Sequence, residues 1–237
     1  MPTAPRRKRA AARDRAAVSY NLVGQRLGRK GQATRERILD AMLRLLADAE
    51  GPPVTLTGVA REAGIGLSNL YLYFPDLGEL LLAALRKVTE DAESEHVERL
   101  RRRWPDDGLE TACREFLRAH FAFWRQHARL LHMRNAMADA NDLRILNYRQ
   151  SATQPLLTFL AMQMAPEGNE PERKHTDVAT VLFTGLERMA TVLTHGNYDL
   201  IHGHMDQPGR QAHAERLLNA EAKVIALAVS AARAETN

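Results

Sequence analysis

Side chains that could recognise nucleic-acid bases gather within residues 56–74, LTGVAREAGIGLSNLYLYF. The Asn69 amide can make two hydrogen bonds with adenine, and the neighbouring Ser68 hydroxyl can donate or accept one. Leu67 and Leu72 offer apolar atoms to the methyl group of thymine. Groups suited to phosphate oxygens lie in this stretch and before it, at Tyr71, Tyr73, Thr55, Thr57, Arg35 and Arg37. For the tyrosines, packing inside the protein is the competing interpretation.

The spacing of small and apolar residues in the same stretch is typical of a helix-turn-helix. Two crossing helices need a small residue at their contact, and Ala60 meets that need. A tight turn needs a residue that tolerates positive φ, and Gly64 follows four positions later. Apolar residues that would hold the two helices against a third stand at Val59, Ala63, Ile65 and Leu70. An ordinary helix hairpin packed into a core is the alternative, but it needs no polar face at residues 68–73.

Charge is distributed unevenly along the chain. Residues 1–37 hold 11 Lys and Arg but only two acids, Asp14 and Glu36, so this region has a net charge of +9. The whole chain has a net charge of +4, which leaves −5 for residues 38–237. A basic arm on a mildly acidic body indicates binding to a polyanion. Charge alone does not distinguish DNA from RNA or from an anionic membrane.

The periodicity of apolar residues predicts an all-α fold of about nine helices. Thr34, Thr55 and Asp76 are expected N-caps, Pro105 an expected stop, and Pro155 an expected bend. We expect helices over residues 34–49, 55–64, 67–73, 76–103, 109–126, 128–138, 142–164, 171–195 and 211–234. The helix over 67–73 would enter the major groove of DNA. Residues 1–33 are expected to be an arm, either without regular structure or with one extra helix at 10–22.

At these residues the chain resembles the tetracycline-repressor (TetR) family of bacterial regulators. The resemblance runs through helix 34–49, the helix-turn-helix at 55–74, and the Tyr71-Leu72-Tyr73-Phe74-Pro75 junction into a helix that contains Glu79-Leu80. It implies a DNA-binding domain at 34–80 and a helical body at 81–237. By the same resemblance, the body houses a ligand pocket and its last two long helices form a dimer interface.

Three positions depart from the usual pattern of this family. Gly66 stands where Ser or Thr commonly caps the recognition helix, so the cap contributes less here. Gly58 replaces a residue that is commonly acidic or polar. Leu77 stands where many members place a lysine against a DNA phosphate. We hypothesise that the basic arm compensates for that missing ion pair, in which case deletion of residues 1–30 reduces both DNA affinity and its salt dependence.

Two apolar stripes near the C-terminus predict a homodimer. They flank residues 196–209 and are rich in small residues, and Gly185 would allow a partner helix to approach closely. Paired with their symmetry mates, they would form a four-helix bundle. The predicted interface residues are Val178, Val181, Leu182, Gly185, Met189, Leu217, Leu218, Val224 and Ile225. Packing within a single chain is the alternative interpretation.

Aromatic and methionine side chains in the body could form a pocket for a small, largely hydrophobic effector. The candidates are Phe121, Trp124, Met133, Met137, Tyr148, Phe159, Met162, Phe183 and Glu187, with His120 and His127 as further polar anchors. A stripe of this composition at helical spacing is equally typical of an ordinary core. The effector itself cannot be identified from the sequence.

Several other classes of function are disfavoured. No apolar run is long enough to span a bilayer, and no apolar segment follows the basic N-terminus as in a secretory signal, so a cytoplasmic protein without a membrane partner is expected. Cys113 is the only cysteine and lies in an apolar stripe, which disfavours both a disulfide and redox sensing. No motif of an enzyme or of a cofactor site is present. His195, His202 and His204, with Asp199 and Asp206, are interpreted as polar surface rather than a metal site.

The sequence therefore predicts a regulator of transcription, and more specifically a repressor that binds a palindromic site in double-stranded DNA and is released by an effector. The alternative is a helical architectural or adaptor protein that binds DNA without sequence preference and without an effector. Tight binding to one palindrome distinguishes the first class from the second.

Overall fold

A computed structural model describes residues 27–48, 51–92, 96–198 and 203–235. Within these residues the chain forms ten α-helices and no strand, which confirms the all-α class with one helix more than expected. The helices are α1 (Arg29–Ala47), α2 (Leu56–Glu62), α3 (Leu67–Leu70), α4 (Leu77–Ala92), α5 (His96–Arg101), α6 (Leu109–Gln126), α7 (Ala128–Asp139), α8 (Leu143–Met164), α9 (Arg173–Leu193) and α11 (Gln207–Ala234), with a 3₁₀ turn at Asp106–Gly108. The proposed extra helix at 10–22 lies outside the described residues.

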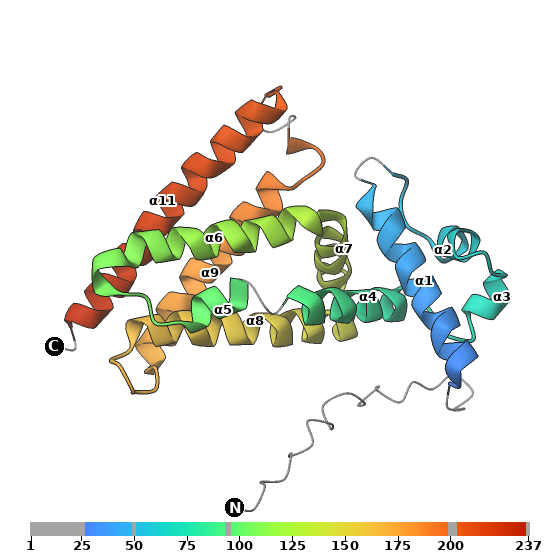
Figure 1. Cartoon of the computed structure of the whole chain (residues 1–237), viewed down its shortest axis with the longest axis horizontal. Helices are drawn as coiled ribbons and strands as arrows, with labels where there is room; N and C mark the ends of the chain where they lie inside the picture. The colour runs from blue at the N-terminus through green and yellow to red at the C-terminus, as the bar shows by residue number, and fades with distance from the viewer. Residues whose placement is uncertain (1–26, 49–50, 93–95, 199–202, 236–237) are drawn as a thin grey trace, which may run out of the picture.

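Helices α1, α2 and α3 form a head at one end of the molecule, and α4 leads from this head into the body (Figure 1). The predicted cap at Thr34 is wrong, because α1 begins earlier, at Arg29. Thr34 is buried inside the helix, where its hydroxyl donates to the carbonyl oxygen of Lys30 at 3.0 Å. A threonine can satisfy its hydroxyl on the preceding turn in this way, and it then gives no signal of a helix start.

The remaining boundaries show which local signals decide where a helix begins. The predicted helix at 76–103 is described as two, α4 and α5, and residues 93–95 between them lie outside the described residues. Helix α11 begins at Gln207 rather than at 211, because Asp206 accepts a hydrogen bond from the Gly209 amide at 2.9 Å. Helix α8 runs continuously through Pro155.

Two hydrophobic clusters form the core. The first joins the head to α4, α7 and the start of α8, with Ile38 and Leu80 fully buried. The second packs α6 against α8, α9 and α11, with Phe116 and Ile225 fully buried. Phe121 packs against both clusters. The head is therefore joined to the body by continuous apolar packing rather than by a linker.

A single arginine of the body also holds the end of α1. The Arg129 guanidinium, on α7, donates to the carbonyl oxygens of Leu45 and Gly51 at 2.8 and 3.0 Å, and also to those of Asp48 and Pro52. The last carbonyl groups of a helix have no partner within it. Arg129 supplies that partner and fixes α7 to the end of α1.

Candidate nucleic-acid interface and ligand cavity

The turn between α2 and α3 has the geometry that the sequence predicts. Gly64 has a φ of +65°, which a residue with a side chain rarely adopts. The Ile65 amide donates to the Ala60 carbonyl oxygen at 3.0 Å and closes the turn, and Ala60 is buried where the helices meet. Thr55 caps α2 as expected, since its hydroxyl accepts from the Gly58 amide at 3.1 Å. Gly66 precedes α3 and makes no side-chain cap.

The helix after this turn is shorter than predicted. Regular α-helix ends at Leu70, and residues 71–73 continue as turns in which the Tyr73 amide donates to the Leu70 carbonyl oxygen at 2.9 Å. Gly66 provides no side chain to stabilise the start of this helix, and Pro75 cannot continue it. Of the residues predicted to contact DNA, Thr57, Ser68, Asn69, Tyr71 and Leu72 are exposed along α2, α3 and these turns.

Other residues proposed for DNA contacts have packing roles as well. Leu67 and Tyr73 are half-buried and pack against the first core cluster. The Arg35 guanidinium lies over the Phe74 ring, 5.1 Å from its centre, whereas Arg37 is exposed. Thr55 is exposed and caps α2. Most of the N-terminal arm, residues 1–26, lies outside the described residues.

Helix α4 connects the head to the body through polar contacts at both ends. Near its start, Arg144 of α8 donates to Asp76 at 2.9 Å and to Glu79 at 3.1 Å. The Asp76 carboxylate also accepts from the Glu79 amide at 2.8 Å and caps the helix as predicted. Further along, Lys87 donates to Glu36 at 2.7 Å and to Asp40 at 2.8 Å, both on α1. Both hydrogen bonds raise the pKa of Lys87, and the bond to Asp40 has the larger effect.

A cavity of about 430 Å³ lies in the body between α4, α5, α6, α7, α8 and α9. Five predicted pocket residues line it together: Trp124, Tyr148, Phe159, Phe183 and Glu187. His120, proposed as a polar anchor, lines it as well. The walls are mostly apolar and aromatic, as is typical of sites for small organic molecules.

Glu187 is the polar centre of this cavity. Its carboxylate accepts from the Trp124 indole at 2.9 Å and from Arg134 at 3.2 Å, and it lies 3.1 Å from His120 Nε2. Burial alone would raise the pKa of this carboxyl, but the hydrogen bond with His120 and the charge of Arg134 hold the pKa down, at about 2. The carboxylate therefore stays charged, and the buried Arg134 neutralises it.

Sequence reasoning missed the other residues that line this cavity, among them Thr89, His96, Phe123 and Arg134. The His96 ring stacks on Phe123 with 5.1 Å between ring centres, and burial lowers the pKa of His96 to about 4. Arg134 is 7% exposed and also lies over the Trp124 ring. A charged residue on a short helix usually indicates surface, and no local pattern marked Arg134 as the partner of a glutamate 53 positions away.

Four predicted pocket residues do not line this cavity. Phe121 belongs to a different cavity, next to α11. Met133 and Met137 pack against the first core cluster. Met162 is 44% exposed on the surface of α8. His127, the other proposed anchor, packs against Phe123 with 5.0 Å between ring centres.

The residues considered for metal or redox chemistry are placed only in part. Asp199 and His202 lie outside the described residues, and the described part of the chain contains no group of three or more metal-ligating side chains. Cys113 is buried, and burial raises the pKa of its thiol well above the ordinary value. No described helix is both long enough and apolar enough to cross a membrane.

Helices α9 and α11 present exposed apolar side chains. Val181 and Leu227 are 73% and 71% exposed, and Val178, Gly185 and Val224 are exposed as well. Leu182, Met189 and Leu217 are half-buried. Two residues assigned to a dimer interface are misplaced, because Leu218 and Ile225 are buried in the core of their own chain. Leu227 was not predicted, although it lies on the same face as Val224, one turn along.

Comparisons with known proteins give the fold a name. A TetR-family transcriptional regulator from Streptomyces coelicolor superposes with a TM-score of 0.61 over 86% of this chain and 83% of its own, at 17% identity. The chain has the TetR fold. A TetR-family regulator from Marinobacter aquaeolei VT8 also superposes, with a TM-score of 0.53 over 83% of this chain and 96% of its own, at 18% identity.

Sequence comparison adds one partial relative. The HTH-type transcriptional repressor DrrR1 of Streptomyces coeruleorubidus is 33% identical over 105 residues, which is 44% of this chain. The match covers 36% of that repressor, so the chain spans about a third of the length of this relative. No family model matches the sequence. Within the TetR fold, the head of this chain is the helix-turn-helix and the cavity lies in the helical body.

Proposed function

We propose that this chain is a DNA-binding transcriptional regulator, and specifically a dimeric repressor that leaves a palindromic operator when a small, largely hydrophobic ligand enters the cavity of the body. The observation that carries this proposal is the position of α4. Thr89 on α4 lines the cavity, and Lys87, two residues earlier, is paired with Glu36 and Asp40 on α1 of the head. A ligand in the cavity therefore touches the same helix that holds the head.

The DNA contacts follow from the exposed side chains of the head. Asn69 and Ser68 would read base edges, Leu72 would contact a thymine methyl group, and Leu67 would support the helix from its half-buried position. Tyr71, Tyr73, Thr55, Thr57, Arg35 and Arg37 would contact phosphates. Phosphate contacts fix the orientation of the head on the duplex, whereas base contacts select the sequence.

The apolar surface of α9 and α11 supports a homodimer. Exposed side chains such as Val181 and Leu227 would be covered by the same surface of a second copy, as a two-fold interface requires. Two heads about 34 Å apart would then meet successive major grooves on one side of a duplex. Such an arrangement selects a palindromic operator.

Ligand release would occur by a shift between two arrangements of α4. A ligand changes DNA affinity only by as much as it favours one arrangement over the other. The aromatic walls around Trp124, Phe159 and Phe183 would bind the apolar part of the ligand. Glu187 and Arg134 neutralise each other, and Arg101, which also lines the cavity, is paired with Glu98. The lining is therefore suited to a ligand without a large net charge.

Fluorescence anisotropy tests the proposal directly. The purified full chain is titrated against duplexes that tile the DNA around its own gene, at two salt concentrations. We expect one palindromic duplex to bind at least about 10³-fold more tightly than the others, with a strong dependence on salt. Equal, weak binding to every duplex overturns the proposal and favours the architectural class. A compound that binds in the cavity without changing operator affinity overturns the release mechanism alone.

A further inference from the structure

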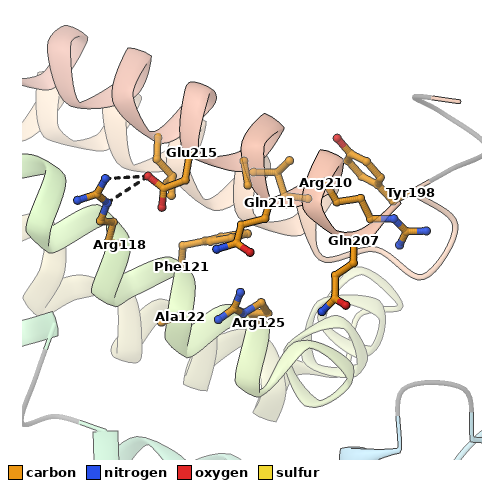
Figure 2. Close-up of a pocket in the computed structure, with 12 residues that line it drawn as sticks. Arg118, Phe121, Ala122, Arg125, Tyr198, Gln207, Arg210, Gln211 and Glu215 are labelled. Atoms are coloured by element: carbon orange, nitrogen blue, oxygen red, sulfur yellow. Dashed lines mark hydrogen bonds and ion pairs between the residues drawn. The ribbon is translucent and has the colours of Figure 1, made fainter. Parts of the chain in front are cut away.

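A second cavity lies on the other side of α6 from the cavity that contains Glu187. It has a volume of about 340 Å³ and is formed by α6, the start of α11 and the segment around Leu193 and Tyr198. Figure 2 shows side chains of α6 and α11 projecting into this space from facing helices. Along α6, His120 and Trp124 line the first cavity, whereas Phe121 and Arg125 line the second. The two cavities are therefore separate sites that share one helix.

The lining of this second cavity carries an excess of positive charge. Three arginines line it, at positions 118, 125 and 210, against a single carboxylate, Glu215. Arg118 is the partner of Glu215, with Nε and Nη2 at 3.2 and 2.8 Å from the same oxygen. Among the described residues no carboxylate lies within ion-pair distance of Arg125, whose side chain is exposed toward the cavity.

Other polar groups around Arg125 are suited to the same kind of ligand. The Arg210 guanidinium lies over the Tyr198 ring, 5.9 Å from its centre, and donates from Nε to the Met205 carbonyl oxygen at 3.2 Å. Gln207 and Gln211 add two side-chain amides that can donate hydrogen bonds. These residues belong to the first turns of α11, where the helix dipole is positive.

The remaining lining is apolar and comes from Phe121, Leu193, Leu218, Ala122 and Ala214. A small inorganic anion would leave this apolar surface uncovered. A carboxylate with an apolar body would cover it and would present its two oxygens to a planar guanidinium, which binds that group with two parallel hydrogen bonds. We propose that this cavity is a binding site for a small organic monocarboxylate, with Arg125 as its principal anchor.

Fluorine NMR tests this site with a defined pair of probes. The full chain is titrated with para-(trifluoromethyl)benzoate and with para-(trifluoromethyl)benzamide, which has nearly the same shape without the charge. We expect the benzoate to bind at least tenfold more tightly than the benzamide at constant ionic strength. No detectable binding of the benzoate, or equal affinity for the two probes, overturns the proposal.

Substitutions then assign the binding to this cavity. Arg125→Gln removes the anchor and is expected to weaken benzoate binding at least tenfold. Arg86→Gln is the matched control, because Arg86 is exposed on α4 and lines neither cavity. Ala122→Phe fills the cavity from an exposed position without changing the charge, and it is also expected to abolish binding. Equal loss in the Arg125 and Arg86 variants, or unchanged binding in Ala122→Phe, overturns the assignment.

This inference is independent of the proposed regulatory function. The binding of benzoate to the second cavity is measured without DNA, so a chain that fails to select an operator still gives a definite result. Conversely, a chain that selects an operator but does not distinguish benzoate from benzamide retains the proposed function and loses only this site.

Discussion

The hydroxyl oxygens of Thr89 and Tyr148 lie 2.6 Å apart and join α4 to α8 at the wall of the first cavity. At the other end of α4, Arg144 of the same α8 binds Asp76 and Glu79. Helix α4 is thus held against α8 at two places, and only the contact of Thr89 with Tyr148 lines the cavity. In the proposed release mechanism, a ligand in that cavity would compete with this contact, whereas the Arg144 contacts would serve as the fixed end.

A double-mutant cycle measures the strength of this contact. We expect Tyr148→Phe and Thr89→Val each to lower the free energy of unfolding, and the pair to show a coupling energy of about 0.5–1.5 kcal/mol in urea denaturation. Thr89 also donates to the Leu85 carbonyl oxygen, so its single variant loses more than the shared bond. Strictly additive effects of the two substitutions would show that the hydroxyl groups do not interact in solution.

The Glu187→Gln variant tests the buried ion pair with Arg134. Removing the charge leaves Arg134 buried without a counter-ion, and we expect a loss of about 3 kcal/mol in the free energy of unfolding at neutral pH. The pKa of Glu187 falls from an ordinary 4.5 to about 2 on folding, so the charged carboxylate stabilises the fold above pH 4.5. This contribution is lost as the pH falls toward 2.

The expected signature is therefore a difference between wild type and Glu187→Gln that shrinks in acid. Urea denaturation at a series of pH values between neutrality and strong acid measures it. Glu215→Gln is the matched control, because Glu215 pairs with Arg118 on the surface and such pairs contribute little. A difference that stays constant across the acid range would show that Glu187 is not held in its charged form.

His96 controls a separate part of the pH dependence of the free energy of unfolding. Burial, and then the neighbouring His120, lower the pKa of His96 from 6.5 to about 4, so the folded protein keeps this ring neutral. The unfolded chain takes up a proton below pH 6.5, and the free energy of unfolding therefore falls as the pH falls toward 4. Between pH 7 and pH 5, this proton uptake costs the wild type about 2 kcal/mol in the free energy of unfolding, and we expect His96→Phe to remove that loss. If the free energy of unfolding falls by the same amount in wild type and in His96→Phe over this pH range, the assignment is contradicted.

The parts of the fold that sequence predicted are those fixed by local chemistry. Gly64 was recognised because a tight turn needs positive φ, and Asp76 because a carboxylate before a helix accepts from its free amides. The same reasoning failed at Thr34, since a threonine that bonds to the preceding turn has the same local appearance as a cap. Local signals identify what a residue can do, and packing decides which of those options it takes.

The cavity was predicted only in part for a related reason. Large aromatic residues such as Trp124 and Phe183 were found because their size favours the interior, but Met133 and Met137 have the same character and pack into the core. The ion pair of Arg134 with Glu187 joins α7 to α9 and depends entirely on tertiary structure. Leu218 belongs to the same stripe of α11 as Leu217, and only the packing of α6 shows that it faces inward.

Asn69→Ala tests the base contact proposed for the head. A good bidentate contact contributes about 1–3 kcal/mol of discrimination, so we expect operator affinity to fall by about tenfold or more while binding to unrelated duplexes is unchanged. Anisotropy titration at fixed salt measures both affinities. Asn169→Ala, in the exposed loop between α8 and α9, is the control and should bind as wild type does. Equal loss on operator and unrelated duplexes would assign Asn69 to the phosphate backbone instead.

Charge placed on the exposed face of α9 and α11 tests the dimer. Val181→Glu and Leu227→Glu alter side chains that are 73% and 71% exposed, so the fold of each chain is expected to survive. In a two-fold interface the same surface of both chains takes part, so each substitution places two charged side chains in an apolar contact. We therefore expect monomers by size-exclusion chromatography with light scattering. Leu143→Glu, at a residue 65% exposed on α8, is the matched control and should remain dimeric. If the α9 and α11 variants stay dimeric, the two heads are joined through another surface. If they become monomeric yet keep full affinity for the palindrome, the two heads read it independently.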